Sequence, residues 1–283
     1  MNSTLTPRKP HVLVVGIDGI RHDSLLAAQT PVLDALAGDG VLLPVRVHEK
    51  NHTVSGPVWS TVATGVYMDR HGVVGNSVHP PEIAAFPDFT ARVRAHDPQA
   101  ATMIAASWHP LAAAVECGPI FSSRGWVNEV DPERENNRGS WLRADDEVAD
   151  YAVKRLAAED LAVSFVYFGE GDVEAHNHGT GPGYIACIER CDARLGRLLT
   201  AIEGRPGRAD EDWSVIVVTD HGHLDRGGHG GESDEERTAW MAASGAGIPV
   251  GVTALDHADI AAQVLAAFGV PDAGLDGVPF GRR

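Results

Sequence analysis

The chain has 283 residues, of which 43% are hydrophobic and 22% charged, and its formal net charge at pH 7 is −16. This length provides for a full hydrophobic core, in one large α/β domain or two small ones. The acidic balance argues against non-specific binding to nucleic acid or to an anionic membrane surface.

No apolar run reaches membrane-spanning length, and residues 1–10 lack the apolar centre of a signal peptide. We therefore expect a cytoplasmic protein. Three cysteines, an odd number, do not indicate a disulfide framework. Cys187 and Cys191 are four apart in a helical pattern, which favours packed thiols over ligands. The sequence carries no signal for an oligomeric state.

The first element is the apolar run that begins at His11, which predicts a strand buried on both faces. Asp18 lies at its carboxyl end, beside Gly19. Taken alone, Asp18 fits a turn or an N-cap equally well. The segment from Thr30 to Gly38 then predicts a short helix, because a capping residue and a proline begin it and a glycine ends it.

Ser55 precedes a helix-like run that ends at Gly65. One interpretation of a hydroxyl at this place is an N-cap. The other is a nucleophile, because the helix dipole and unpaired N–H groups can hold a phosphate oxygen there. Metal coordination would lower the pKa of such a serine. Asn76 follows in a loop and has an amide that can donate to an oxyanion.

Residues 80–143 carry fewer signals. A helix is predicted at Phe89–His96 and a buried strand at Ala101–Ala106. Residues 115–143 show little periodicity, and we interpret them as a variable loop inserted over the site. Five of its residues are candidates for contact with a substrate, and the alternative is that they are solvated loop residues. They are Trp126, Asn128, Asn136, Asn137 and Trp141. An amphipathic helix is predicted at Asp145–Asp160.

The strand predicted at Leu161–Phe168 is followed by a loop rich in acids and histidines. Asp172 and His176 are four residues apart in it. If the loop forms one helical turn, the two side chains share a face and can bind one ion. Glu174 and His178 are further candidates, and a solvated loop is the alternative. A long helix at Tyr184–Ile202 comes next.

A short apolar run, Val215–Val218, delivers Asp220 and His221 side by side at its end. Open α/β sheets bind their ligands beyond the carboxyl ends of such strands. A carboxylate next to an imidazole suits Zn²⁺ or a similar divalent ion. His229 lies between glycines, which let the backbone bring its imidazole into a crowded site. A strand at Ala239–Ala243 and a helix at Asp256–Leu265 complete the expected elements.

These elements predict a single α/β domain over residues 1–283, with a largely parallel central sheet and helices on both faces. Three strand ends supply acids and imidazoles, and a serine at a helix start and a glycine-flanked histidine join them. The set suits two metal ions beside one alcohol oxygen. Its members are Asp18, Ser55, Asp172, His176, Asp220, His221 and His229.

The sequence resembles the alkaline phosphatase superfamily, nearest its nucleotide pyrophosphatase/phosphodiesterase branch. The match runs from about Val12 to Ile248. The matching pieces, in order, are Gly-Ile-Asp18-Gly, Ser55-Gly-Pro with Thr64-Gly and His71-Gly, Asp172-x-x-x-His176, Thr-Asp220-His221-Gly and Gly-His229-Gly.

The resemblance implies two zinc ions, with manganese or iron as alternatives. One ion would be held by Asp18, Ser55, Asp220 and His221, and the other by Asp172, His176 and His229. Ser55 would attack phosphorus to form a phosphoseryl enzyme, which is then hydrolysed. The implied partner is a small phosphate-ester substrate, with nucleotides among the candidates.

Three other functions stay open. A phosphomonoesterase acting on a small cytoplasmic metabolite is chemically close, and the branch usually has threonine where Ser55 stands. A sulfatase is suggested by Ser55-Gly-Pro57, although Trp59 stands where that motif needs arginine. A metal-binding or phosphate-sensing protein without catalysis is the last. Monoesterases bind phosphate with an arginine that cannot be located from this sequence. Arg124, Arg138 and Arg143 are guesses for it.

Overall fold

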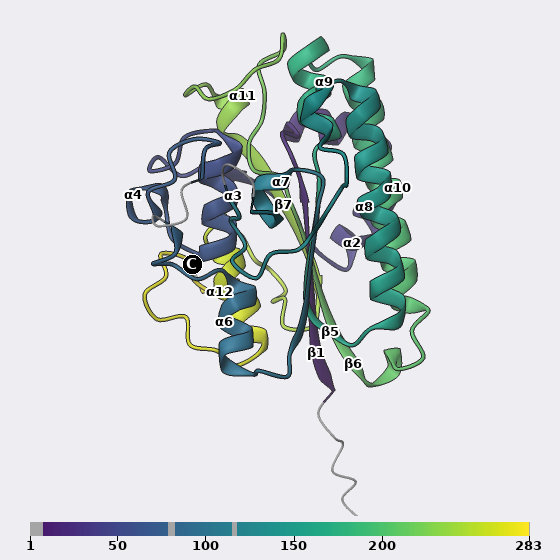
Figure 1. Ribbon diagram of the computed structural model, residues 1–283, viewed down its shortest axis with the longest axis vertical. Coiled ribbons are helices and arrows are strands. Elements are labelled where there is room, and N and C mark those ends of the chain that lie inside the picture. The colour runs from purple at the N-terminus through teal and green to yellow at the C-terminus, as the bar shows by residue number, and fades with distance from the viewer. Residues whose placement is uncertain (1–7, 79–82, 115–117, 283) are drawn as a thin grey trace, which may run out of the picture.

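The structure is a computed structural model that describes residues 8–78, 83–114 and 118–282. Within these residues a sheet forms the centre of the molecule (Figure 1). It has seven strands in the order β2-β7-β6-β1-β5-β3-β4. The strands are β1 (Lys9–Ile17), β2 (Gly40–Arg46), β3 (Ala101–Ala106), β4 (Trp126–Val127), β5 (Leu161–Phe168), β6 (Glu211–Val218) and β7 (Thr238–Gly245).

The pairs from β6 through β1, β5 and β3 to β4 are parallel, whereas β7 and β2 add an antiparallel edge. The predicted α/β fold with a largely parallel sheet in one domain is confirmed. Strand β2 was not predicted from the sequence. Its Pro44 interrupts the strand signal, and such a proline is tolerated because β2 lies at the sheet edge.

Helices cover both faces of the sheet (Figure 1). They are α1 (His22–Ala27), α2 (Pro31–Gly38), α3 (Ser55–Thr64), α4 (Met68–His71), α6 (Phe89–His96), α7 (His109–Ala112), α8 (Arg138–Ala158), α9 (Glu170–His178), α10 (Pro182–Glu203), α11 (Asp234–Arg237) and α12 (Asp259–Ala267). Short 3₁₀ turns lie at Pro132–Arg134 (η1) and Arg208–Asp210 (η2).

The two faces follow from the alternation of side chains along buried strands. In β1, Val12 and Val14 pack into the core under α3, α6 and α12. Leu13 and Val15 pack into the opposite core, under α2, α8 and α10. Cys187 and Cys191 are buried on α10 as free thiols, as the helical spacing predicted.

Helix α8 begins at Arg138, seven residues before the predicted start at Asp145. Asn137 caps it, because its side chain accepts from the N–H of Ser140 while the Ser140 hydroxyl receives the N–H of Asn137. The end of the predicted loop is therefore helical. That residues 115–143 are an insertion stays a prediction, and residues 115–117 lie outside the described part. Among the described residues, no helix is both long and apolar enough to cross a membrane.

Candidate active site

The sequence-predicted ligands lie beyond the carboxyl ends of β1, β5 and β6. These three strands are neighbours and parallel, so their ends meet at one edge of the sheet. Asp18 directly follows β1, and its N–H donates to Phe168 O at the end of β5 at 2.9 Å. Asp220 follows β6 after a single residue. The loop expected to coil after β5 does so as α9, which carries Asp172 and His176.

Ser55 is the first residue of α3 and is buried. Its Oγ lies 3.5 Å from Nε2 of His221. Because the extended residue Val54 is the N-cap, the Ser55 hydroxyl is not a capping group for this helix. Gly56 lets the backbone approach closely, since a Cβ there would lie 2.1 Å from Gly75 O. The nucleophile interpretation of Ser55 thus fits the geometry better than the N-cap interpretation.

Asp18, Asp220 and His221 form the first cluster, and all three side chains are buried. One oxygen of each carboxylate is occupied: Asp18 Oδ2 accepts from Trp59 and Tyr167, and Asp220 Oδ1 accepts from Gly19 N–H. The other oxygens have no hydrogen-bond partner among the described residues. Those oxygens, Asp18 Oδ1 and Asp220 Oδ2, lie 3.8 and 3.1 Å from His221 Nε2.

The pKa values of the first cluster are shifted by burial and by the neighbouring charges. Burial, followed by the nearby charges of Asp220 and Asp172, raises the pKa of Asp18 well above its usual value. Burial also raises the pKa of Asp220 to about 8, although the Gly19 N–H acts in the opposite direction. Burial lowers the pKa of His221 well below its usual value. A bound cation favours the deprotonated form of all three groups.

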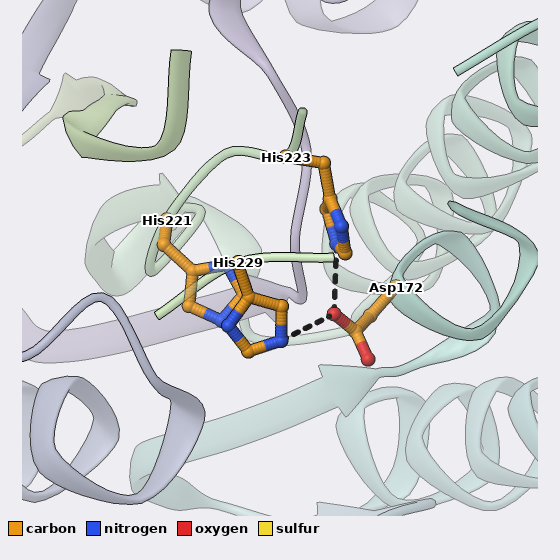
Figure 2. A group of neighbouring side chains, drawn as sticks. All are labelled: Asp172, His221, His223 and His229. Atoms are coloured by element: carbon orange, nitrogen blue, oxygen red, sulfur yellow. Dashed lines mark hydrogen bonds and ion pairs between the residues drawn. The ribbon is translucent and has the colours of Figure 1, made fainter. Parts of the chain in front are cut away.

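Asp172, His176 and His229 form the second cluster. His229 Nε2 lies 2.9 Å from His176 Nε2 and 3.5 Å from Asp172 Oδ1, and His176 Nε2 lies 3.5 Å from Asp172 Oδ2. The rings of His221 and His229 stack with centroids 3.8 Å apart, which joins the two clusters (Figure 2). Glu174 and His178 lie outside both clusters and pair with each other at 3.0 Å.

The glycines around His229 have the role that the sequence suggested. Gly228 and Gly230 both have positive φ angles, of 87° and 105°. At Gly227 a Cβ would lie 2.0 Å from Ala175 O on α9. The loop therefore packs close to α9, and His229 donates from Nδ1 to Thr53 O at 2.7 Å. This fixes the ring with Nε2 toward the cluster.

The side chains fit two divalent ions. Two donors bound tetrahedrally to one zinc ion at about 2.0–2.1 Å lie roughly 3.3 Å apart. The pairs Asp220–His221, Asp172–His176 and Asp172–His229 have ligand atoms 3.1, 3.5 and 3.5 Å apart. Where the outer atom of a side chain makes a hydrogen bond, the inner atom of that side chain remains available to bind an ion. Metal sites commonly have this arrangement.

His223 is a member of this site that the sequence analysis missed. It is fully buried, and its Nε2 lies 2.9 Å from Asp172 Oδ1 (Figure 2). Burial acts to raise the pKa of Asp172, but the hydrogen bond from His223 and the neighbouring imidazoles outweigh burial and lower this pKa below its usual range. A further imidazole two residues after His221, in a stretch already assigned to the site, was the available signal.

Asn76, the predicted donor to a phosphate oxygen, lies close to Ser55 in the structure. Its Oδ1 accepts from Gly56 N–H at 2.9 Å. Among the described residues no acceptor is bonded to the Nδ2 group of the amide, which can therefore donate to a ligand. Asn76 and Ser55 line the same hollow, so the amide can reach a phosphate oxygen held there.

The hollow beside Ser55 has a volume of about 170 Å³. It is lined by Asp18, Ser55, Asn76, Trp108, Glu133, Asn136, Trp141, Tyr167, Gly169, Asp172, Val173 and His176. Two suggested loop residues, Asn136 and Trp141, are among them; Trp126, Asn128 and Asn137 are not. The three suggested arginines are also absent from this lining. Arg143 pairs with Glu135 at 3.2 Å and Arg138 approaches Glu174 at 3.8 Å.

An α/β sheet that gathers carboxylates, imidazoles and one serine at its carboxyl edge is typical of metal-dependent hydrolases of phosphate and sulfate esters. A family model described as type I phosphodiesterase/nucleotide pyrophosphatase matches residues 12–228. The chain belongs to this family, which lies in the nucleotide pyrophosphatase/phosphodiesterase branch of the alkaline phosphatase superfamily.

Curated relatives are ectonucleotide pyrophosphatase/phosphodiesterase family member 7 of Homo sapiens and of Rattus norvegicus. Each is 26% identical over 237 residues, which is 75% of this chain and 47% and 49% of the relative, respectively. The chain thus spans about half the length of these relatives.

Solved structures share the fold at low identity. Murine ectonucleotide pyrophosphatase/phosphodiesterase 5, in an inactive form in complex with AMP, has a TM-score of 0.67 and 16% identity, over 95% of this chain and 97% of that one. A phosphonate monoester hydrolase of Agrobacterium radiobacter has a TM-score of 0.69 and 18% identity, over 96% and 76%. A sulfatase described as putative, from Bacteroides thetaiotaomicron, has a TM-score of 0.71 and 14% identity, over 96% and 73%.

Proposed function

We propose that this protein is a metal-dependent phosphodiesterase in which Ser55 is the nucleophile. The observation that carries the proposal is the position of Ser55 Oγ at the start of α3, 3.5 Å from His221 Nε2. Beside it, Asp18 and Asp220 each turn toward His221 one buried oxygen that has no hydrogen-bond partner in the part of the chain that the structure describes. The family match supports hydrolysis of a phosphodiester or nucleotide pyrophosphate.

The residues would hold two zinc ions. Manganese and iron are alternatives, because the same ligands accept several divalent ions. Asp18, Ser55, Asp220 and His221 suit one ion. Asp172, His176 and His229 suit the other. When bound, such ions supply positive charge that lowers the pKa of the serine hydroxyl and stabilises negative charge on the phosphate oxygens.

Ser55 and Asn76 have separate roles in the reaction. Ser55 Oγ attacks phosphorus, the bond to the leaving oxygen breaks, and a phosphoseryl enzyme forms. Water then breaks the phosphoserine bond and returns the hydroxyl. Asn76 Nδ2 donates to a phosphate oxygen through both steps, because its other end is fixed by Gly56. Positioning and electrostatics of this kind provide most of the catalysis in phosphoryl transfer.

A diester fits this hollow better than a monoester. A monoester carries a second negative charge, which in monoesterases is met by an arginine clamp. The described lining of the hollow contains neither arginine nor lysine. The sulfatase alternative is weakened by Trp59, whose indole N–H donates to Asp18 at 2.8 Å where the sulfatase motif needs arginine. The murine neighbour in complex with AMP supports nucleotide-like esters as candidates. A cytoplasmic location stays a prediction.

Hydrolysis of a nitrophenyl phosphodiester and of the matching monoester tests the function. We expect the zinc-loaded protein to turn over the diester with the higher kcat/KM. Chelation should remove both activities, and added zinc should restore them, because the buried carboxylates need a cation to stay ionised. A higher kcat/KM for the monoester would favour the phosphatase alternative. Activity unaffected by complete metal removal would contradict the proposal.

Replacement of His223 with alanine is expected to weaken zinc binding about 10–100-fold, the usual effect of losing a group that orients a ligand. Asp172 would lose the N–H that holds its carboxylate at 2.9 Å. Competition with a chromogenic chelator at fixed pH measures the affinity. His178→Ala is the matched control, because His178 lies on α9 with Asp172 but faces Glu174. Equal affinities in the two variants would exclude this role.

A further inference from the structure

Helices α8, α9 and α10 enclose a group of buried charges that the reaction does not use. The three helices pack against one another on one face of the sheet (Figure 1). Where they meet, Asp145 and Glu170 are fully buried, and only 3% of the Arg194 side chain is exposed. Arg194 donates from Nη1 to Glu170 Oε2 at 3.0 Å and lies 3.6 Å from Asp145 Oδ2. Because buried charges need well-paired geometry, this group fixes the three helices relative to one another.

Asp145 caps α9 from the neighbouring helix α8. The N-cap residue of α9 is Gly169, which has no side chain to fill that role. Asp145 Oδ1 accepts the N–H of Gly169 at 3.0 Å, and Oδ2 accepts the N–H of Glu170 at 2.9 Å. Bonds from backbone N–H groups to a carboxylate at a helix N-terminus are charge-assisted. Burial raises the pKa of Asp145 to about 6, and Arg194 acts against this shift, so the carboxylate is mostly ionised at neutral pH.

The first turn of α9 is also packed closely against its surroundings. A Cβ at Gly169 would lie 2.4 Å from Cζ3 of Trp141, and a Cβ at Gly171 would lie 2.4 Å from Cδ1 of Ile20. From the other side, Arg190 on α10 donates from Nε to Glu170 Oε1 at 3.0 Å. The start of α9 is therefore held by contacts with α8, α10 and the segment after β1.

The ligands assigned to the second ion depend on this turn. Asp172 and His176 both project from α9, whereas the first ion is assigned to side chains that follow β1 and β6 or begin α3. A metal site needs its ligands within about 0.5 Å of the productive geometry. Within the described part of the chain, no ligand of the first ion is hydrogen-bonded to Asp145, Glu170 or Arg194.

We propose that the charge network of Asp145, Glu170, Arg190 and Arg194 positions α9 for the second ion, with Asp145 as the residue that holds the first turn. The first ion is independent of this network. The inference rests on the proposed metal-dependent function and adds a positioning residue that lies on α8, outside both ligand clusters.

Zinc affinity in two parent proteins tests this role. Asp220→Ala with His221→Ala retains only the ligands of the second ion, and Asp172→Ala with His229→Ala retains only those of the first. Asp145→Asn is added to each parent, because asparagine can accept only one of the two N–H groups. Competition with a chromogenic chelator at neutral pH should show zinc binding about 10–100-fold weaker in the first parent, the usual effect of losing a group that orients a ligand. In the second parent the affinity should not change.

Asp146→Asn is the matched control. Asp146 is the next residue on α8 and also accepts from Arg194, at 2.9 Å, but it makes no hydrogen bond to α9 within the described residues. It should leave zinc affinity unchanged in both parents. If Asp145→Asn does not fold, Arg190→Gln takes its place, because it removes a partly exposed donor to Glu170 and should give the same difference between the parents at smaller size.

The outcomes separate this inference from the function on which it rests. Equal weakening in both parents indicates a general loss of structure and would overturn the positioning role, as would unchanged affinity in both. Absence of zinc uptake by the wild type would overturn it as well. The expected difference between the parents, in a wild type that binds zinc but hydrolyses no phosphodiester, would support the positioning role and refute the proposed function alone.

Discussion

Replacement of Ser55 with alanine is expected to lower phosphodiester hydrolysis by at least about a thousandfold, because the nucleophile is lost while the rest of the site remains. Zinc should still bind, since Asp18, Asp220 and His221 keep their ligand atoms. Initial rates with a nitrophenyl diester, together with zinc content by mass spectrometry, measure both quantities on one preparation.

Ser60→Ala is the matched control for this variant. Ser60 is buried in the same helix, and its hydroxyl has no hydrogen-bond partner among the described residues. Its removal should leave kcat/KM near the wild-type value. If Ser55→Ala retained wild-type activity, the phosphoseryl pathway would be excluded, even with zinc bound.

Removal of the metal ions is expected to destabilise the protein, and more so at pH 8 than at pH 6.5. In the ion-free protein Asp220 has a pKa of about 8, and the pKa of Asp18 is also raised. A carboxyl with a raised pKa keeps its proton when folded but releases it when unfolded. Stability therefore falls as pH rises from the usual carboxyl pKa toward the folded value.

The titration of the histidines limits the pH range in which this loss of stability can be measured. Burial lowers the pKa values of His221 and His229, so stability that depends on their neutral forms is lost as pH falls below the usual histidine pKa. Above about pH 6.5 the histidine effect fades and the carboxyl effect dominates. For one carboxyl group with a pKa of about 8 in the folded state, the loss of folding stability amounts to about 2 kcal/mol between pH 6.5 and 8.

Zinc should cancel this loss, because it binds the deprotonated ligands. At free zinc a thousandfold above the dissociation constant, the gain is about 4 kcal/mol per site. Denaturant unfolding at the two pH values, with zinc and with chelator, measures the difference. The Asp220→Asn variant should show a smaller fall with pH in its ion-free form. Equal stabilisation by zinc at both pH values would contradict buried carboxylates as the binding groups.

The strands, and the acids and histidines that follow them, could be predicted because their signals are local. A buried strand is an unbroken apolar run, and Asp18, Asp172 and Asp220 each follow such a run closely. The shared face of Asp172 and His176 required only one helical turn, which α9 provides. Parallel strand order then brings the three ends together without further information.

The missed features depend on tertiary structure. His223 reaches Asp172 only because the chain after β6 passes beside α9, a path that no periodicity encodes. Glu133 lies in a segment without a repeating pattern, and its place in the hollow follows from a capped 3₁₀ turn and the bond from Trp108. Strand β2 was overlooked because it contains Pro44, which only an edge strand tolerates.

An anomalous difference map from crystals of the zinc-loaded protein, recorded on both sides of the zinc absorption edge, tests the two-ion arrangement most directly. We expect two peaks, one bounded by Ser55, Asp220 and His221 and the other in contact with Asp172 and His229. A single peak remote from Ser55, or no peak in crystals of fully zinc-soaked protein with these side chains ordered, would contradict the account.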